Sequence, residues 1–126
     1  MSENIYFISE GIVGNGDVGN DLLIASNNND VLKGLEGNDQ IYGGDGDDTI
    51  EGGDGNDTIY GGADHDTITG GKGVDTIYGG DGNDTLVDFG DSIIYGGKGN
   101  DVFRQDREEN YLNYYYGEPT YGLTLY

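Results

Sequence analysis

A nine-residue repeat dominates the sequence. From Gly43, five units follow one another without insertion: GGDGDDTIE, GGDGNDTIY, GGADHDTIT, GGKGVDTIY and GGDGNDTLV, which ends at Val87. A repeat this short is typical of a solenoid, in which each unit buries its apolar residues only against its neighbours. The repeat therefore constrains the fold more than any other feature of the chain.

Weaker copies extend the series in both directions. GDVGNDLLI (16–24), ASNNNDVLK (25–33) and GLEGNDQIY (34–42) precede it, and the eight-residue DFGDSIIY (88–95) and GGKGNDVFR (96–104) follow it. Aspartate stands at the sixth position of nine of the ten units, and Ile, Leu or Phe stands at the eighth position of all ten. Residues 16–104 are thus predicted to form one continuous array.

Each unit combines turn residues with strand residues. Glycine at the first, second and fourth positions suits a turn, since it accepts left-handed dihedrals and close backbone approach. The last three residues should alternate outward, inward, outward. We therefore predict a six-residue turn and a three-residue strand per unit, with two units to a coil. The predicted core is Leu23, Leu32, Ile41, Ile50, Ile59, Ile68, Ile77, Leu86, Ile94 and Phe103.

The predicted fold is all-β. Stacked coils give a parallel β-roll, a two-sheet β-solenoid of about ten nonapeptide turns with N- and C-terminal caps. We predict an N-terminal cap at 1–15, in which Ile5, Phe7, Ile12 and Val13 could cover the first coil, the roll at 16–104, and a Tyr-rich C-terminal cap or tail at 105–126.

The pattern GGxGxDxUx, in which U is a large apolar residue, resembles the RTX or haemolysin-type calcium-binding repeats of bacterial secreted proteins. The resemblance covers 16–104 and is most specific at 43–87. It implies that stacked turns hold calcium with sixth-position carboxylates and with carbonyls of the glycine turns. Such hard oxygen ligands suit calcium better than magnesium. We expect roughly four to eight calcium ions.

The resemblance assigns a ligand role to specific residues. The carboxylate ligands that it implies are Asp21, Asp30, Asp39, Asp48, Asp57, Asp66, Asp75, Asp84 and Asp101. Third-position Asp45, Asp54 and Asp81 should offer mainly carbonyls. The turn glycines of the predicted sites are Gly43, Gly46, Gly52, Gly55, Gly61, Gly70, Gly73, Gly79 and Gly82.

Several units depart from the pattern. Asp64 replaces the fourth-position glycine of its unit, and we expect the turn to survive because Asp tolerates left-handed dihedrals. Ser92 stands where the shortened unit 88–95 should have aspartate, so we expect its site to be weakened or lost. The unit 25–33 has no glycine, which makes its site doubtful. His65 is interpreted as a surface residue without a special role.

Composition excludes several classes of function. Lys plus Arg is 5 and Asp plus Glu is 25, so the net charge of −20 opposes binding to nucleic acid or insertion into an anionic membrane. The absence of cysteine excludes disulfides and thiolate metal sites. We expect no enzymatic activity, because the repeat already accounts for every aligned aspartate and no nucleophile and base stand out.

The leading functional prediction is a module that folds on calcium binding. A core of one apolar residue per unit is thin, and the chain's negative charge opposes a compact state without cations. The resemblance implies a role in the secretion, folding or stability of a secreted bacterial protein. We expect an extracellular location, reached by a type I route without an N-terminal signal peptide.

An alternative uses the outer face of one sheet. Tyr42, Tyr60, Tyr78 and Tyr95 should form a stripe there, with threonines dominating the other sheet. The stripe is explained either by β-propensity and stacking or by docking. Docking would make the chain a calcium-dependent structural, adhesive or self-assembling protein, with a second copy, another protein or a glycan as partner.

Overall fold

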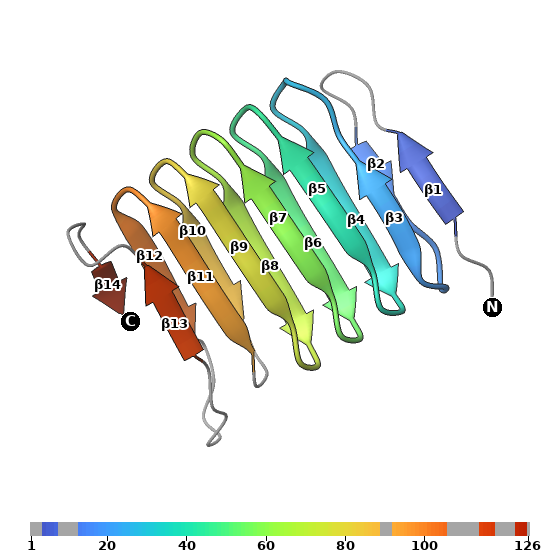
Figure 1. Ribbon diagram of the computed structural model, residues 1–126. Helices are drawn as coiled ribbons and strands as arrows, with labels where there is room; N and C mark the ends of the chain where they lie inside the picture. The colour runs from blue at the N-terminus through green and yellow to red at the C-terminus, as the bar shows by residue number, and fades with distance from the viewer. Residues whose placement is uncertain (1–3, 8–12, 89–91, 106–113, 118–122, 126) are drawn as a thin grey trace.

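The computed structural model describes residues 4–7, 13–88, 92–105, 114–117 and 123–125, and these form two seven-stranded parallel sheets (Figure 1). The odd-numbered sheet contains, in spatial order, β1 (Asn4–Phe7), β3 (Asp21–Ile24), β5 (Gln40–Gly44), β7 (Thr58–Gly62), β9 (Thr76–Asp81), β11 (Ile93–Lys98) and β13 (Tyr114–Gly117). The even-numbered sheet contains β2 (Val13–Asn15), β4 (Val31–Glu36), β6 (Thr49–Asp54), β8 (Thr67–Lys72), β10 (Thr85–Asp88), β12 (Asp101–Gln105) and β14 (Leu123–Leu125).

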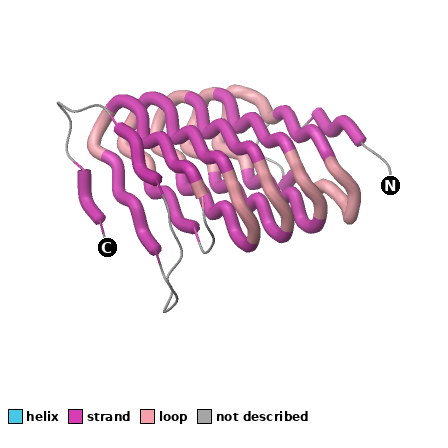
Figure 2. The backbone as a smooth tube through the Cα atoms, turned by 60° about the horizontal axis from the view of Figure 1, so that its bottom comes forward, coloured by secondary structure: helices cyan, strands magenta, loops and turns pink. Residues whose placement is uncertain are grey.

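The chain winds as a flattened coil that alternates between the sheets. Figure 2 shows strands on the two long sides and short bends between them. Ile41 pairs with Ile59 and Ile59 with Ile77, so each coil advances the register by two repeat units. The shortened unit is absorbed in the next step, where Ile77 pairs with Ile94. The predicted all-β, two-sheet parallel solenoid is confirmed, whereas the count of about ten turns and the caps stay predictions.

The described part of the chain contains no helix, and accordingly no helix there is long and apolar enough to cross a membrane.

Most strands are longer than the predicted three residues. Strand β6 runs from Thr49 to Asp54 and so includes the first three residues of the next repeat unit. Its burial alternates from Thr49 as exposed, buried, exposed, buried before the chain bends. From Gly34 onward, the first glycine of a unit thus continues the strand and faces inward, whereas Gly16 follows the end of β2. Neighbouring coils supply backbone partners that override the weak strand preference of glycine.

The predicted core is confirmed in full. All ten eighth-position side chains are at most 1% exposed and form one cluster between the sheets. Because the coils repeat, equivalent side chains stack in two rows, one on the inner face of each sheet. The interior is therefore one apolar layer, flanked at each edge by the turns.

Glycine is required at two positions by backbone conformation. Gly53 and Gly55, at the second and fourth positions, have φ values of +101° and +121°. Leu35 and Asp64 are the described non-glycine residues with positive φ, at 78° and 75°. The prediction that Asp64 keeps its turn left-handed is confirmed.

Strands at both ends continue the sheets. Strand β1 pairs with β3, β2 with β4, β13 with β11 and β14 with β12, all in parallel. In β1, Ile5 and Phe7 are 61% and 78% exposed, so the expectation that they cover the first coil is wrong. Alternation turns Tyr6 inward instead, where it packs against the core. Ile12 lies outside the described residues, and the division into caps and roll stays a prediction.

The buried core predicts how two matched substitutions change the free energy of unfolding. Ile59→Ala should lower the free energy of unfolding by about 2–5 kcal/mol, because the stacked side chains leave a cavity. Thr67→Ala, on the exposed outer face, should change it by less than about 0.5 kcal/mol. Urea unfolding followed by circular dichroism measures both. Equal effects of the two substitutions would contradict the single-layer core.

Candidate metal centre

The predicted carboxylate ligands are buried at the two edges of the roll. All nine sixth-position aspartates are at most 3% exposed. The cause is strand alternation, since the seventh residue of each unit faces outward and the sixth therefore faces inward. Turns from the even-numbered to the odd-numbered sheet form what we call the first edge, and the return turns form the second edge. The first edge carries Asp21, Asp39, Asp57 and Asp75; the second carries Asp30, Asp48, Asp66, Asp84 and Asp101.

One oxygen of each carboxylate joins a ladder along its edge. The backbone N–H of Asp39 donates to Oδ1 of Asp57 at 2.8 Å, and the N–H of Asp57 donates to Oδ1 of Asp75 at 2.8 Å. On the second edge, the N–H groups of Asp48 and Asp66 donate in the same way to Asp66 and Asp84. Each link joins residues one coil apart, so the carboxylates connect successive coils.

The second oxygen has no hydrogen-bond partner in the regular turns. This holds for buried Oδ2 atoms of six aspartates, namely Asp39, Asp48, Asp57, Asp66, Asp75 and Asp84. A buried carboxylate oxygen without a partner is costly, and a cation is the group that would compensate it. Calcium fits this donor chemistry, since its ligands in proteins are carboxylate and carbonyl oxygens.

The first-position glycines leave room beside these oxygens. A Cβ added to Gly52 would lie 2.5 Å from Oδ2 of Asp57 and 2.7 Å from the carbonyl oxygen of Gly70 in the next coil. The equivalent atom on Gly61 would meet Oδ2 of Asp66 at 2.5 Å and the Gly79 carbonyl oxygen at 2.7 Å. Carboxylate and carbonyl oxygens thus converge on a space that only glycine leaves open, and first-position Gly43 and Gly79 share this arrangement. A Cβ on a predicted fourth-position glycine would instead meet a backbone carbonyl of the preceding coil, as at Gly46, Gly55, Gly73 and Gly82.

Side chains alone do not make the site. No group of three or more His, Cys, Asp or Glu side chains suited to a metal occurs among the residues that the structure describes. The side chains of Asp45, Asp54 and Asp81 are exposed, and the carbonyl of Asp54 accepts the N–H of Gly37 at 3.0 Å. Backbone carbonyls would therefore have to supply much of any oxygen cage. The full predicted ligand set stays a prediction.

Burial raises the pKa values of these carboxyls. Desolvation is the main cause, and like charges of neighbouring aspartates add to it. The pKa of Asp39 is raised to about 6, those of Asp48, Asp57 and Asp84 to about 7, and that of Asp66 to about 8. Desolvation, together with the adjacent Asp88 carboxylate, raises the pKa of Asp75 to about 9. The carboxylates are thus poorly stabilised as anions without a cation.

The first two turns bond their carboxylates differently, and in the first of them it is Oδ1 of Asp21 that is buried without a partner. Oδ2 of Asp21 accepts the N–H of Asp17 at 2.7 Å. Oδ2 of Asp30 accepts both the N–H and the hydroxyl of Ser26, each at 3.1 Å. The glycine-free turn of residues 25–30 therefore supplies donors where regular turns leave the oxygen unpartnered, which is a physical reason for a weaker cation site there.

A second ladder lies outside the first and was not predicted. The side chain of a fifth-position residue accepts a hydrogen bond from the backbone N–H of the fifth-position residue in the next coil. The N–H of Asn56, for example, donates to Oδ1 of Asn38 at 2.8 Å. His65 belongs to this ladder, because its N–H donates to Asp47 and its Nδ1 accepts the N–H of Asn83 at 2.8 Å. His65 is exposed, as predicted for a surface residue, but it is not without a role, because its side chain forms one link of this ladder. The recurrence of asparagine at the fifth position was the available sequence signal.

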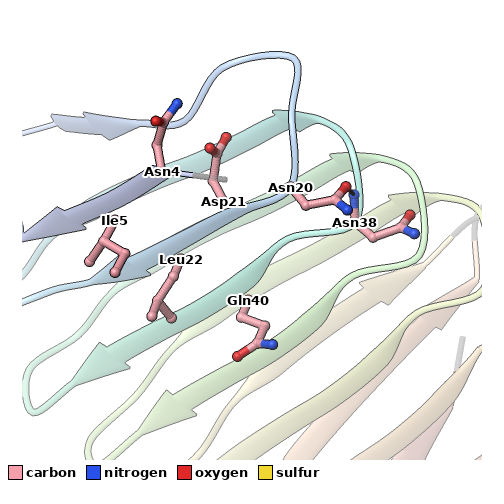
Figure 3. Close-up of a pocket in the computed structure, with 7 residues that line it drawn as sticks. All are labelled: Asn4, Ile5, Asn20, Asp21, Leu22, Asn38 and Gln40. Atoms are coloured by element: carbon pink, nitrogen blue, oxygen red, sulfur yellow. Dashed lines mark hydrogen bonds between the residues drawn. The ribbon is translucent and has the colours of Figure 1, made fainter. Parts of the chain in front are cut away.

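A pocket of about 330 Å³ lies over the first strands of the odd-numbered sheet, and Asp21 is the one buried sixth-position aspartate among its lining residues. Figure 3 shows Ile5, Leu22 and Gln40 on successive strands, with Asn20 and Asn38 at the bend. The N–H of Asn38 donates to Oδ1 of Asn20 at 2.7 Å, so this rim is part of the outer ladder. We assign the pocket no chemistry.

The predicted tyrosine stripe is present on the odd-numbered sheet. Rings of Tyr42, Tyr60, Tyr78 and Tyr95 stack with centroid separations of 4.7–4.8 Å and interplanar angles of 2–3°. Each ring covers the next, so stacking within the chain is sufficient to explain the stripe. A docking role for this face stays a prediction.

One comparison with known proteins identifies a family. The profile of the RTX calcium-binding nonapeptide repeat (4 copies) matches residues 15–50, 51–86 and 88–104. No curated protein and no solved structure matches the chain. The matched segments coincide with the coils that carry the buried aspartates.

The raised pKa values predict how pH acts on the metal-free chain. Because the folded pKa values of about 6–9 lie above the ordinary value of 3.8, their contribution to stability is present in full below about pH 3.8. It is lost as pH rises through 6 to 9. The calcium-free chain should therefore show more β signal in circular dichroism at pH 5 than at pH 8.5.

A salt control separates buried charge from surface repulsion. At about 1 M salt, exposed charges are screened within roughly 3 Å, whereas buried carboxylates are screened much less. Salt at pH 8.5 should therefore restore only part of the signal seen at pH 5. Full restoration by salt, or a signal that does not change with pH, would contradict the assignment to buried aspartates.

Proposed function

Since the chain belongs to the RTX calcium-binding nonapeptide repeat family, and its repeats are therefore a calcium-binding β-roll module, we propose that calcium binding drives its folding. The observation that carries this proposal is the row of buried Oδ2 atoms without hydrogen-bond partners at each edge. Without cations, folding must bury these carboxylates as anions or protonate them. With calcium bound, binding free energy becomes folding free energy.

The residues that would hold calcium are the regular sixth-position aspartates with the carbonyls beside the first-position glycines. When bound, calcium would supply positive charge next to oxygens that have no other partner. The aspartate ladder holds each carboxylate by its other oxygen, and this fixes the direction of Oδ2. The chain's own task is thus to keep carboxylates and carbonyls at a constant spacing from coil to coil.

A biological role follows from the difference in free calcium concentration between the inside and the outside of a cell. RTX repeats are typical of secreted bacterial proteins. A chain that stays open at low calcium and winds up at high calcium could be exported unfolded and fold outside, where it would assist the folding or stability of a secreted protein. The net charge of −20 supports this proposal, because self-repulsion keeps the calcium-free chain open.

Far-UV circular dichroism of the chelator-treated chain at pH 7.5, titrated with calcium, tests the proposal. We expect a cooperative rise of β signal with calcium and little response to the same concentrations of magnesium, which holds its water more tightly. A β signal that is complete in chelator and unchanged by calcium would overturn the proposal.

Asp57→Asn should favour folding in the absence of calcium and weaken folding in its presence. The amide oxygen can still accept the Asp39 N–H, but the buried negative charge is gone. In chelator at pH 7.5 the variant should show more β signal in circular dichroism than the parent, because one buried charge fewer opposes folding. In calcium it should need about 10-fold or more calcium for half-folding, since a charged ligand is worth about 1.5–3 kcal/mol.

The matched control for this variant is Asp47→Asn. Asp47 is exposed, and asparagine occupies the same position in most other units, so the hydrogen bond from His65 should persist. The net charge changes by the same amount as in Asp57→Asn, but the calcium concentration needed for half-folding should shift by less than about 2-fold. Equal shifts for Asp57 and Asp47 would mean that overall charge, rather than the buried site, governs folding.

A further inference from the structure

The irregular unit 88–95 places a second kind of carboxylate at the first edge. Asp88 ends strand β10 in the first position of its unit, where the regular units have glycine. Strand alternation turns this position inward, and Asp88 is accordingly 0% exposed. Its side chain therefore occupies the space that the first-position glycines leave open.

Ser92 takes over the ladder contact of the missing aspartate. Its Oγ accepts the backbone N–H of Asp75 at 2.9 Å, as Oδ1 of an aspartate does in the coils before it. The same hydroxyl donates to Oδ2 of Asp88 at 2.6 Å. Serine and aspartate together thus reproduce the two functions of one regular carboxylate: one oxygen holds the ladder, and the other group brings negative charge into the edge.

The remaining oxygen of Asp88 lies beside Gly70, where the regular coils have a carbonyl oxygen of the next coil. Oδ1 of Asp88 and Oδ2 of Asp75 both lie beside the Cα of Gly70, within contact distance of the position where a Cβ would be. Asp75 is 0% exposed, and its Oδ2 has no hydrogen-bond partner. Two buried carboxylates therefore face one space, one of them with an unpartnered oxygen directed into it.

We propose that Asp88, held by Ser92, is a calcium ligand that replaces the missing sixth-position carboxylate, so that the row of calcium sites on the first edge continues through the irregular unit. This inference rests on the proposed calcium binding of the regular turns. It replaces the sequence-based expectation that the site next to Ser92 is weakened or lost. Although the unit 88–95 is one residue shorter than the others, β11 stays in register with β9.

Equilibrium dialysis at saturating calcium, with bound calcium determined by atomic absorption, tests the assignment. Asp88→Asn keeps an oxygen that can accept from Ser92 but loses the charge, and should bind at least one calcium ion fewer per chain than the parent. Its half-folding calcium concentration should rise about 10-fold. Asp47→Asn, with the same change in charge, should bind the full number of ions.

A swap variant tests the assignment even if Asp88→Asn fails to fold. Asp88→Gly combined with Ser92→Asp returns the unit to the repeat pattern and should restore the parent's ion count and half-folding concentration. A full ion count and unchanged half-folding for Asp88→Asn would overturn the inference and indicate that the carboxyl pair shares a proton instead. A swap variant that fails to fold or binds fewer ions would also overturn it. A parent chain that binds no calcium would overturn the proposed function itself.

Discussion

The structure depends on how the roll accommodates a buried carboxylate in almost every turn. One oxygen of each regular aspartate accepts a backbone N–H from the preceding coil, as Asp57 does from Asp39 at 2.8 Å. The other oxygen is buried without a hydrogen-bond partner. The hydrogen bond holds successive coils together, whereas burial of the unpartnered oxygen disfavours an ionised carboxylate in the folded chain. The proposed function follows from this arrangement, since a cation that binds the second oxygen would link folding to binding through single side chains.

The rest of the repeat follows from this arrangement. First-position glycine continues the strand inward and leaves space beside Oδ2, so a Cβ on Gly52 would collide with the Asp57 carboxylate. Second- and fourth-position glycines provide the positive φ angles with which the chain bends, as at Gly53 and Gly55. One apolar residue per unit fills the interior. Such a core is too thin to offset the backbone entropy of a glycine-rich chain by itself, which leaves a role for the edges.

Much of this was predictable because a nine-residue period fixes which side chains share a face. The core from Leu23 to Phe103, the tyrosine stripe and the inward sixth-position aspartates all follow from the period and from strand alternation. Strand length was not predictable, because first-position glycines resemble turn residues until neighbouring coils pair with them. The ladder through His65 and the inward side chain of Asp88 depend on which atoms meet one coil away. Recurring asparagine at the fifth position signals the ladder, but a single histidine, or a first-position aspartate in a shortened unit, does not show which atoms it will meet.

The most direct test of the account is native mass spectrometry of the chain at sub-saturating calcium. This measurement separates compact from extended molecules by their charge states and counts the ions bound to each. If buried aspartates make folding and binding one event, compact molecules carry a nearly full set of calcium ions and extended molecules carry almost none. A substantial population of compact molecules without calcium at neutral pH would contradict the account, because the roll would then fold with its carboxylates uncompensated.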